Sequence, residues 1–133
     1  MTMILCNPTP NTSIRGRLGK IKQETKMINY TTPTISLIVE GTDISAHDVF
    51  VTLEQGKKKL TKSGADLNIT TETHDQVTDT KIALTLTQEE SASFDYNRNV
   101  AIQVNYITSQ GVRDATEMKN IGVMRNLLDE VIA

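Results

Sequence analysis

The sequence is poor in the residues that build many functional sites. It has one cysteine (Cys6), no tryptophan, three tyrosines and two phenylalanines in 133 residues. A single cysteine excludes an intramolecular disulfide and makes a cysteine-based metal site implausible. The fold must therefore be held together by packing alone, as expected of a protein that matures in a reducing cytoplasm.

The scarcity of aromatic residues also bears on the ligands that the protein can bind. Carbohydrate-binding sandwiches and single-strand nucleic-acid grooves use exposed aromatic rings as stacking platforms. We expect Phe50 and Phe94 to lie in the core, and Tyr106 in the core or at an edge. The remaining rings are too few for such a platform.

Long apolar runs are absent as well. The apolar residues 3–6 are too short for the hydrophobic region of a signal peptide, and no basic residue precedes them. No stretch approaches the length of a membrane-spanning helix. The sequence therefore predicts a protein without a secretion signal and without a membrane partner.

Charge divides the chain into two parts. Residues 1–26 hold five basic side chains and one acidic one, whereas residues 27–133 hold nine basic and fifteen acidic ones. The acidic part argues against nucleic-acid binding by the folded domain. Residues 1–26 also lack periodicity, so we expect a disordered basic leader. Met27 is an alternative start of the protein, and a genuine basic arm is the other interpretation.

What the sequence does contain is alternation of apolar and polar residues. A period of two places one face of each strand in a core and the other face in water. Seven such segments, separated by regular turn signals, predict one all-β domain over residues 27–133. The pattern favours an antiparallel immunoglobulin-like sandwich, with a small barrel as the alternative. The expected strands are residues 33–40, 48–55, 58–62, 66–73, 80–86, 98–108 and 112–124.

Two segments depart from this alternation. Thr87-Gln88-Glu89-Glu90 fits a capping box, which predicts one helical turn that crosses from one sheet to the other, with Phe94 in the core beneath it. The C-terminal segment places Leu127, Leu128, Val131 and Ile132 on one face of a short helix, for which Asn126 is a suitable N-cap.

That C-terminal helix would be too short to be stable alone. The four apolar residues must therefore be covered by another molecule or by the open end of the same sandwich. We favour an intermolecular contact, which makes these four residues the candidate protein interface.

No catalytic constellation is visible. The chain lacks a G-x-S-x-G elbow and a phosphate-binding loop, and the capping box already explains Glu90. The best metal candidate is His74 in the segment Glu72-Thr73-His74-Asp75, with Asp79 nearby, but a polar hairpin loop explains these residues more simply. The sequence therefore predicts a non-enzymatic protein without a metal or a cofactor.

Four stretches of the sequence together carry a resemblance. They are Pro33-Thr34-Ile35-Ser36-Leu37, the strand VFVTLEQ from Val49 to Gln55, the segment LTLTQEE with Phe94, and the block VAIQVNYITSQGVRDATEMKNIGVMRNLLDEVI. They resemble small uncharacterised proteins from phages and prophages of gut Firmicutes. They also resemble, more loosely, the N-terminal β-sandwich module of phage baseplate upper proteins. The resemblance covers about residues 27–133 and concerns structural motifs rather than catalytic ones.

The resemblance implies a phage structural or virion-assembly accessory protein that acts through protein–protein contacts. Its partners would be other virion proteins or further copies of itself, in the bacterial host cytoplasm, the virion or both. No stretch of the sequence resembles the receptor-binding or multimerising domain that follows the sandwich in full baseplate proteins, so we do not expect a direct role in host adhesion. The alternative is a β-sandwich that binds a ligand or glycan and has no connection with virions.

Overall fold

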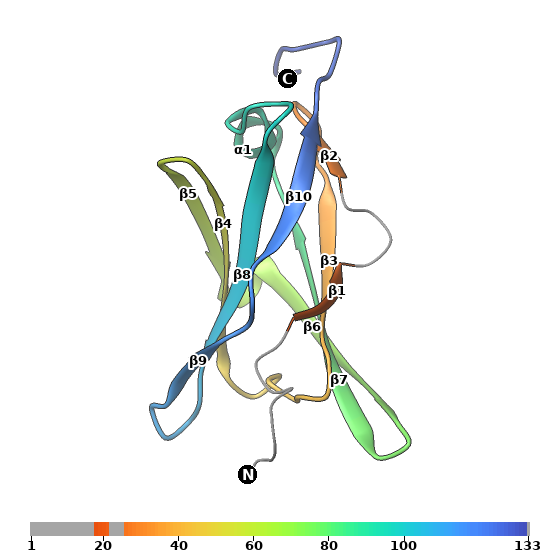
Figure 1. The fold of residues 1–133 in the computed structure, drawn as a ribbon, viewed down its shortest axis with the longest axis vertical. Helices are drawn as coiled ribbons and strands as arrows, with labels where there is room; N and C mark the ends of the chain where they lie inside the picture. Colours follow the sequence, from red (N-terminus) through yellow and green to blue (C-terminus); the bar gives the residue numbers. More distant parts are fainter. Residues whose placement is uncertain (1–17, 22–25, 133) are drawn as a thin grey trace.

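Ten β-strands make up most of the described structure. The computed structural model describes residues 18–21 and 26–132 (Figure 1). Two short helices accompany the strands: the 3-10 helix η1 (Gly64–Asp66) and α1 (Gln88–Ala92). The strands are β1 (Leu18–Ile21), β2 (Lys26–Ile28), β3 (Thr34–Val39), β4 (Asp48–Gln55), β5 (Lys58–Ser63), β6 (Leu67–His74), β7 (Val77–Thr85), β8 (Asn99–Ile107), β9 (Arg113–Ala115) and β10 (Lys119–Met124).

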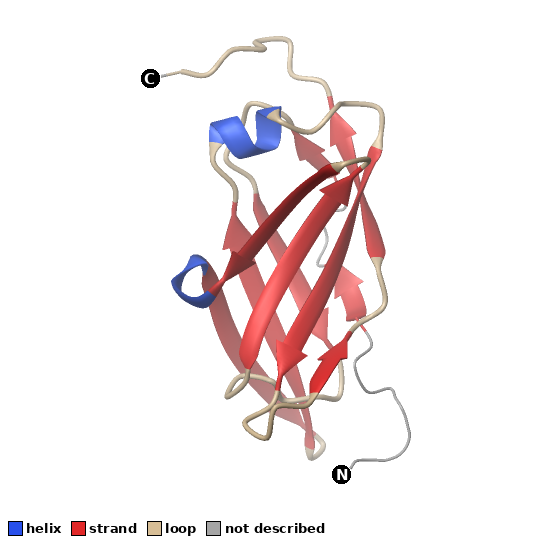
Figure 2. Ribbon diagram, turned by 90° about the vertical axis from the view of Figure 1, so that its left-hand side faces the viewer, coloured by secondary structure: helices blue, strands red, loops and turns tan. Residues whose placement is uncertain are grey.

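The strands form two sheets that face each other (Figure 2). One sheet has the order β1-β3-β7-β6. The other has the order β2-β10-β8-β4-β5, and β9 also pairs with β8 in it. The β2–β10 pair is parallel, and the other pairs among the described residues are antiparallel. The predicted all-β class is therefore confirmed.

One hydrophobic core lies between the sheets, and the alternation in the sequence builds it. Every second residue of β3, β4 and β8 is buried, and the residues between them face outward. Full burial of one such apolar side chain stabilises the fold by about 1.5–3 kcal/mol relative to leaving it exposed. The buried apolar residues of these three strands are Ile35, Leu37, Val39, Val49, Val51, Leu53, Val100, Ile102, Val104 and Tyr106.

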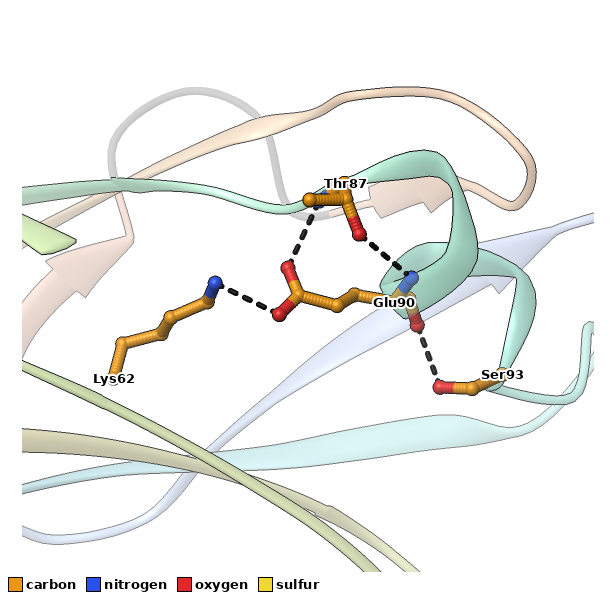
Figure 3. A network of polar contacts seen from close by, with 4 residues as sticks. All are labelled: Lys62, Thr87, Glu90 and Ser93. Atoms are coloured by element: carbon orange, nitrogen blue, oxygen red, sulfur yellow. Dashed lines mark hydrogen bonds and ion pairs between the residues drawn. The ribbon is translucent and has the colours of Figure 1, made fainter. Parts of the chain in front are cut away.

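The predicted crossover is confirmed. Helix α1 joins β7 of one sheet to β8 of the other, and Phe94 is buried beneath it. The hydroxyl of Thr87 accepts from the N–H of Glu90 at 3.1 Å, and the Glu90 carboxylate accepts from the N–H of Thr87 at 2.9 Å. These reciprocal bonds satisfy two donors that a helix start leaves free (Figure 3).

The predicted disordered leader is described only in part, at residues 18–21 and at Lys26. Residues 18–21 form β1, which pairs with β3, and Lys26 begins β2, which pairs with β10. Both pairings are made by main-chain groups, so they need no apolar alternation in the sequence. Met27 is 2% exposed, within the core. The remaining residues of the leader lie outside the described part of the chain.

The last predicted strand, 112–124, is divided into β9 and β10 by residues 116–118. The side chain of Thr116 is buried, and its hydroxyl accepts from the N–H of Val104 at 3.1 Å. The N–H of Thr116 in turn donates to the carbonyl of Val104 at 2.8 Å. A side-chain oxygen thus replaces a main-chain carbonyl in the ladder, and the regular pairing stops there.

Candidate functional site

The C-terminal segment does not form the predicted helix. Residues 125–132 contain neither helix nor strand. The side chain of Asn126 accepts from the N–H of Leu128 at 3.0 Å, which closes a local turn instead of capping a helix. The N–H of Asn126 donates to the side chain of Asn29 at 3.0 Å. These contacts hold the segment in an irregular path, and seven residues are too few to favour a helix over it.

The four predicted interface residues nevertheless remain exposed at one end of the molecule. Leu127, Leu128, Val131 and Ile132 are between 44% and 88% exposed. Figure 1 shows the segment leaving β10 at the end of the molecule where α1 also lies. The structure therefore brings the four residues to one end without placing them on one helical face.

Three further exposed apolar residues lie at the same end. Ile28 and Met124 are paired neighbours on β2 and β10. The turn that carries Tyr96 is tied to β10, because the N–H of Asn97 donates to the carbonyl of Val123 at 2.9 Å. The resulting set is called the terminal surface below. It consists of Ile28, Tyr96, Met124, Leu127, Leu128, Val131 and Ile132.

Two polar contacts hold parts of the terminal surface in place. The Gln88 side chain, on α1, donates to the carbonyl of Ile132 at 2.9 Å and accepts from its N–H at 2.8 Å. The guanidinium of Arg125 lies 5.9 Å from the centre of the Tyr96 ring, within the range of a cation–π contact. These contacts position the main chain of Ile132 and the ring of Tyr96 within the terminal surface.

The ion pair beneath α1 supports this end of the fold. Lys62 Nζ lies 2.8 Å from Glu90 Oε2 (Figure 3), and both side chains are largely buried. Burial raises the pKa of the Glu90 carboxyl, but the hydrogen bonds from Lys62 and from Thr87, together with the charge of Lys62, outweigh it and lower the pKa. Glu90 is therefore held as a carboxylate, and its two oxygens accept hydrogen bonds from Lys62 and from the N–H of Thr87.

A second carboxyl group with a lowered pKa, that of Asp43, lies in the polar loop between β3 and β4. Hydrogen bonds from the hydroxyl and the N–H of Ser45 lower the pKa of the Asp43 carboxyl, against a smaller opposing effect of burial. His47 in the same loop stacks on Tyr106 with ring centres 5.8 Å apart. These contacts fix the shape of the loop.

The polar hairpin expected around His74 is present, because β6 and β7 turn at Asp75 and Gln76. His74 Nε2 lies 3.3 Å from Asp79 Oδ2, and the other oxygen of Asp79 accepts from the N–H of Gly41. Within residues 18–21 and 26–132, no group of three or more His, Cys, Asp or Glu side chains is placed to hold a metal ion. Over the same residues, none of the helices has the length and apolar character needed to cross a membrane.

Phe50 was expected in the core, and this prediction is wrong. It lies on the outer face of the sheet that contains β4 and β8, in a hollow that Ile107 and Arg113 also line. The alternation along the strand indicates the orientation of Phe50. Val49 and Val51 face the core, so Phe50 between them must face outward. The residue type, rather than its position in the pattern, had suggested burial.

Searches for similar proteins add no family to these observations. No protein-family model and no curated protein sequence matches the chain.

Proposed function

We propose that this chain is a non-enzymatic immunoglobulin-like β-sandwich that assembles with other proteins through its terminal surface. In this proposal it is a phage structural or virion-assembly accessory protein. Its partners are other virion proteins or further copies of itself.

The strand order supports the immunoglobulin-like assignment. In such folds one sheet has the strand order ABED, and the other contains C, F and G, with C′ added in variable-type domains. If β1 and β2 share the role of strand A, the first sheet reads β1-β3-β7-β6 as ABED. The second sheet then reads β10-β8-β4-β5 as GFCC′, with β2 added beside strand G. The chain lacks the disulfide and the tryptophan of antibody domains, and the core of aliphatic residues takes their place.

The observation that carries the functional proposal is the exposure of the terminal surface. Seven large apolar side chains lie at one end of the sandwich, and Leu127 is 88% exposed. Exposed apolar groups are unfavourable in water, and contiguous apolar patches mark interaction sites on soluble proteins. Tyrosine and methionine, both present here, are enriched in protein interfaces. The resemblance to phage proteins in the sequence supports the virion setting.

The test replaces two residues of the terminal surface by charged ones. The double variant Leu128→Asp/Ile132→Asp is compared with the wild type by size-exclusion chromatography with light scattering, and by thermal melting. We expect the wild type to self-associate and the variant to be a monomer with an unchanged melting midpoint. Both residues are already exposed, so their replacement removes little packing within the monomer.

A matched control variant carries the same chemical change at the opposite end of the molecule. Val77 and Val112 are exposed apolar residues, at the start of β7 and in the β8–β9 hairpin (Figure 1). Val77→Asp/Val112→Asp should associate like the wild type. A monomeric wild type contradicts self-assembly through this surface. A Leu128→Asp/Ile132→Asp variant that unfolds would place the tail in the core instead.

A further inference from the structure

Two adjoining hollows lie on the outer face of the six-stranded sheet, and none of their lining residues belongs to the terminal surface. Their volumes are about 310 and 220 Å³. They share Thr52, Asn105 and Arg113, so they form one continuous groove across β5, β4, β8 and β9. We call it the sheet groove. Phe50 and Ile107 line one half of it, and Glu54, Lys59 and Gln103 line the other.

The strand register explains why these side chains meet. Phe50 is paired with Asn105, and Ile107 is paired with Arg113, so the four side chains lie on neighbouring strands of one face. In the other half, Glu54 is paired with Ala101. The side chain of Ala101 is shorter than those around it, so it leaves open space in this half of the groove.

The polar groups of the groove are held by contacts with one another and with the main chain. Arg113 donates through Nε and Nη2 to the side-chain oxygen of Asn105, at 3.3 Å each. Gln103 Nε2 donates to the carbonyl of Thr116 at 2.8 Å. The hydroxyls of Thr52 and Thr61 are 3.1 Å apart. Groups positioned in this way lose little conformational entropy when a ligand binds.

Each of these side chains has hydrogen-bonding capacity beyond the contacts just described. The amide nitrogen of Asn105 is a donor, the amide oxygen of Gln103 is an acceptor, and Arg113 has further N–H groups on its guanidinium. Glu54 and Lys59, 3.8 Å apart, add an acceptor and a donor at the far end. The groove thus combines one aromatic ring with planar groups that donate and accept.

We propose that the sheet groove binds a saccharide. Phe50 lies outside the core and supplies the one stacking ring, which would pack against the apolar face of a sugar ring. Asn105, Arg113 and Gln103 would form hydrogen bonds with its hydroxyls. A protein partner fits less well, because Glu54 and Lys59, two residue types that are depleted from protein interfaces, line one half of the groove. A nucleic acid also fits less well, because Glu54 lies in the groove and residues 27–133 are acidic overall.

The test is a titration of the full chain, labelled with nitrogen-15, with four tetrasaccharides followed by NMR. The probes are β-1,4-linked glucose, α-1,4-linked glucose, β-1,4-linked N-acetylglucosamine and α-1,4-linked galacturonate, each at up to about 5 mM, a range that detects dissociation constants near 1 mM. We expect at least one probe to cause saturable shifts of amides in β4, β8 and β9. Stronger binding of galacturonate than of the neutral sugars would show that Arg113 selects a carboxylate.

Variants that remain folded test whether the groove residue Phe50 contributes to saccharide binding. Phe50→Ala should weaken binding about three- to tenfold, since an aromatic contact is worth that much, and Phe50→Tyr should retain it. A control variant, Asn68→Ala, lies in a smaller hollow of about 150 Å³ on the four-stranded sheet and should bind like the wild type. The proposal is overturned if no probe causes saturable shifts, if the shifts map to another surface, or if Phe50→Ala binds as well as the wild type while remaining folded.

Discussion

The side-chain amide of Gln88 closes a ring of two hydrogen bonds with the main chain of Ile132, at 2.9 and 2.8 Å. Gln55 makes the same arrangement with Asp95, at 2.9 and 2.7 Å. The two rings differ in burial, because the bonds between Gln88 and Ile132 are exposed whereas those between Gln55 and Asp95 are partly buried. Water competes for exposed hydrogen bonds and reduces their net contribution to stability. Gln88 therefore positions the C-terminal segment without burying it.

The first prediction concerns this contact. Gln88→Ala removes both bonds to Ile132, so amide hydrogen exchange at residues 127–132 should become faster. The free energy of unfolding should change by less than about 0.5 kcal/mol, because the contact is exposed. Gln110→Ala, at an exposed glutamine in the β8–β9 hairpin, serves as the control. An unchanged exchange rate for the amide of Ile132 would show that Gln88 does not hold the tail.

The sequence was sufficient to predict the elements whose signals are local. Thr87 and Glu90 specify a capping box through their spacing alone, and the alternation around Val51 and Ile102 specifies buried strand faces. In both cases, residues close in sequence determine the structure.

The elements that the sequence did not predict depend on distant partners. Strand β1 exists through main-chain bonds to β3, and no residue of β1 signals that pairing. The tail from Asn126 has a helical pattern of apolar residues, but contacts with Asn29 and Gln88 draw it into an irregular path. To predict the sheet groove one must know the register of β4, β5, β8 and β9. Turn signals and alternation in the sequence do not determine that register.

The second prediction concerns the break between β9 and β10. Thr116→Val removes the hydroxyl that accepts from the buried N–H of Val104 and leaves that donor without its partner. We expect a loss of about 1–3 kcal/mol in the free energy of unfolding, measured by urea denaturation. Thr116→Ser keeps the hydroxyl and should lose clearly less. Equal losses in the two variants would mean that the methyl group, rather than the hydroxyl, matters.

The third prediction concerns the pH dependence of the Lys62–Glu90 pair. The pKa of Glu90 is lowered in the folded protein, so its contribution to stability is present above the unfolded value near 4.5 and disappears as the pH falls through the folded value. Glu90→Gln can preserve the bond to Thr87 but loses the ion pair. We expect it to be about 1 kcal/mol less stable than the wild type at pH 7.

This difference should vanish in acid, where the Glu90 carboxyl of the wild type is itself protonated. Chemical denaturation at pH 7, 5, 4 and 3 measures the difference between the two proteins. Glu89→Gln, at the exposed neighbour, is the matched control and should follow the wild type across the series. A difference that is constant with pH would contradict a role for the charge of Glu90.

The fourth prediction concerns the tip of the β6–β7 hairpin. Asp75 and Gln76 have φ angles of 52° and 64°, in the left-handed region that favours glycine. Gln76→Gly should therefore stabilise the protein by about 0.5–1 kcal/mol, since it relieves the strain of the side chain there. Gln110→Gly, in the other long hairpin, is the control. A thermal midpoint that falls in Gln76→Gly would contradict the assignment of strain to this turn.

The last prediction concerns β1, which lies within residues 1–26, the segment that the sequence predicts to be a disordered leader. A chain that begins at Met27 lacks β1 and leaves one edge of β3 without its pairing, whereas a chain that begins at Leu18 retains it. Each net hydrogen bond contributes about 0.5–1.5 kcal/mol, so the shorter chain should be less stable than the longer one by about 1–3 kcal/mol. The exposed edge of β3 should also make the shorter chain more prone to aggregate, because an unpaired strand edge is a template for pairing with another molecule. Urea denaturation measures the first effect, and light scattering at rising concentration measures the second. Equal stability and equal solubility of the two chains would show that β1 is dispensable and would restore the interpretation of the whole leader as an unstructured extension.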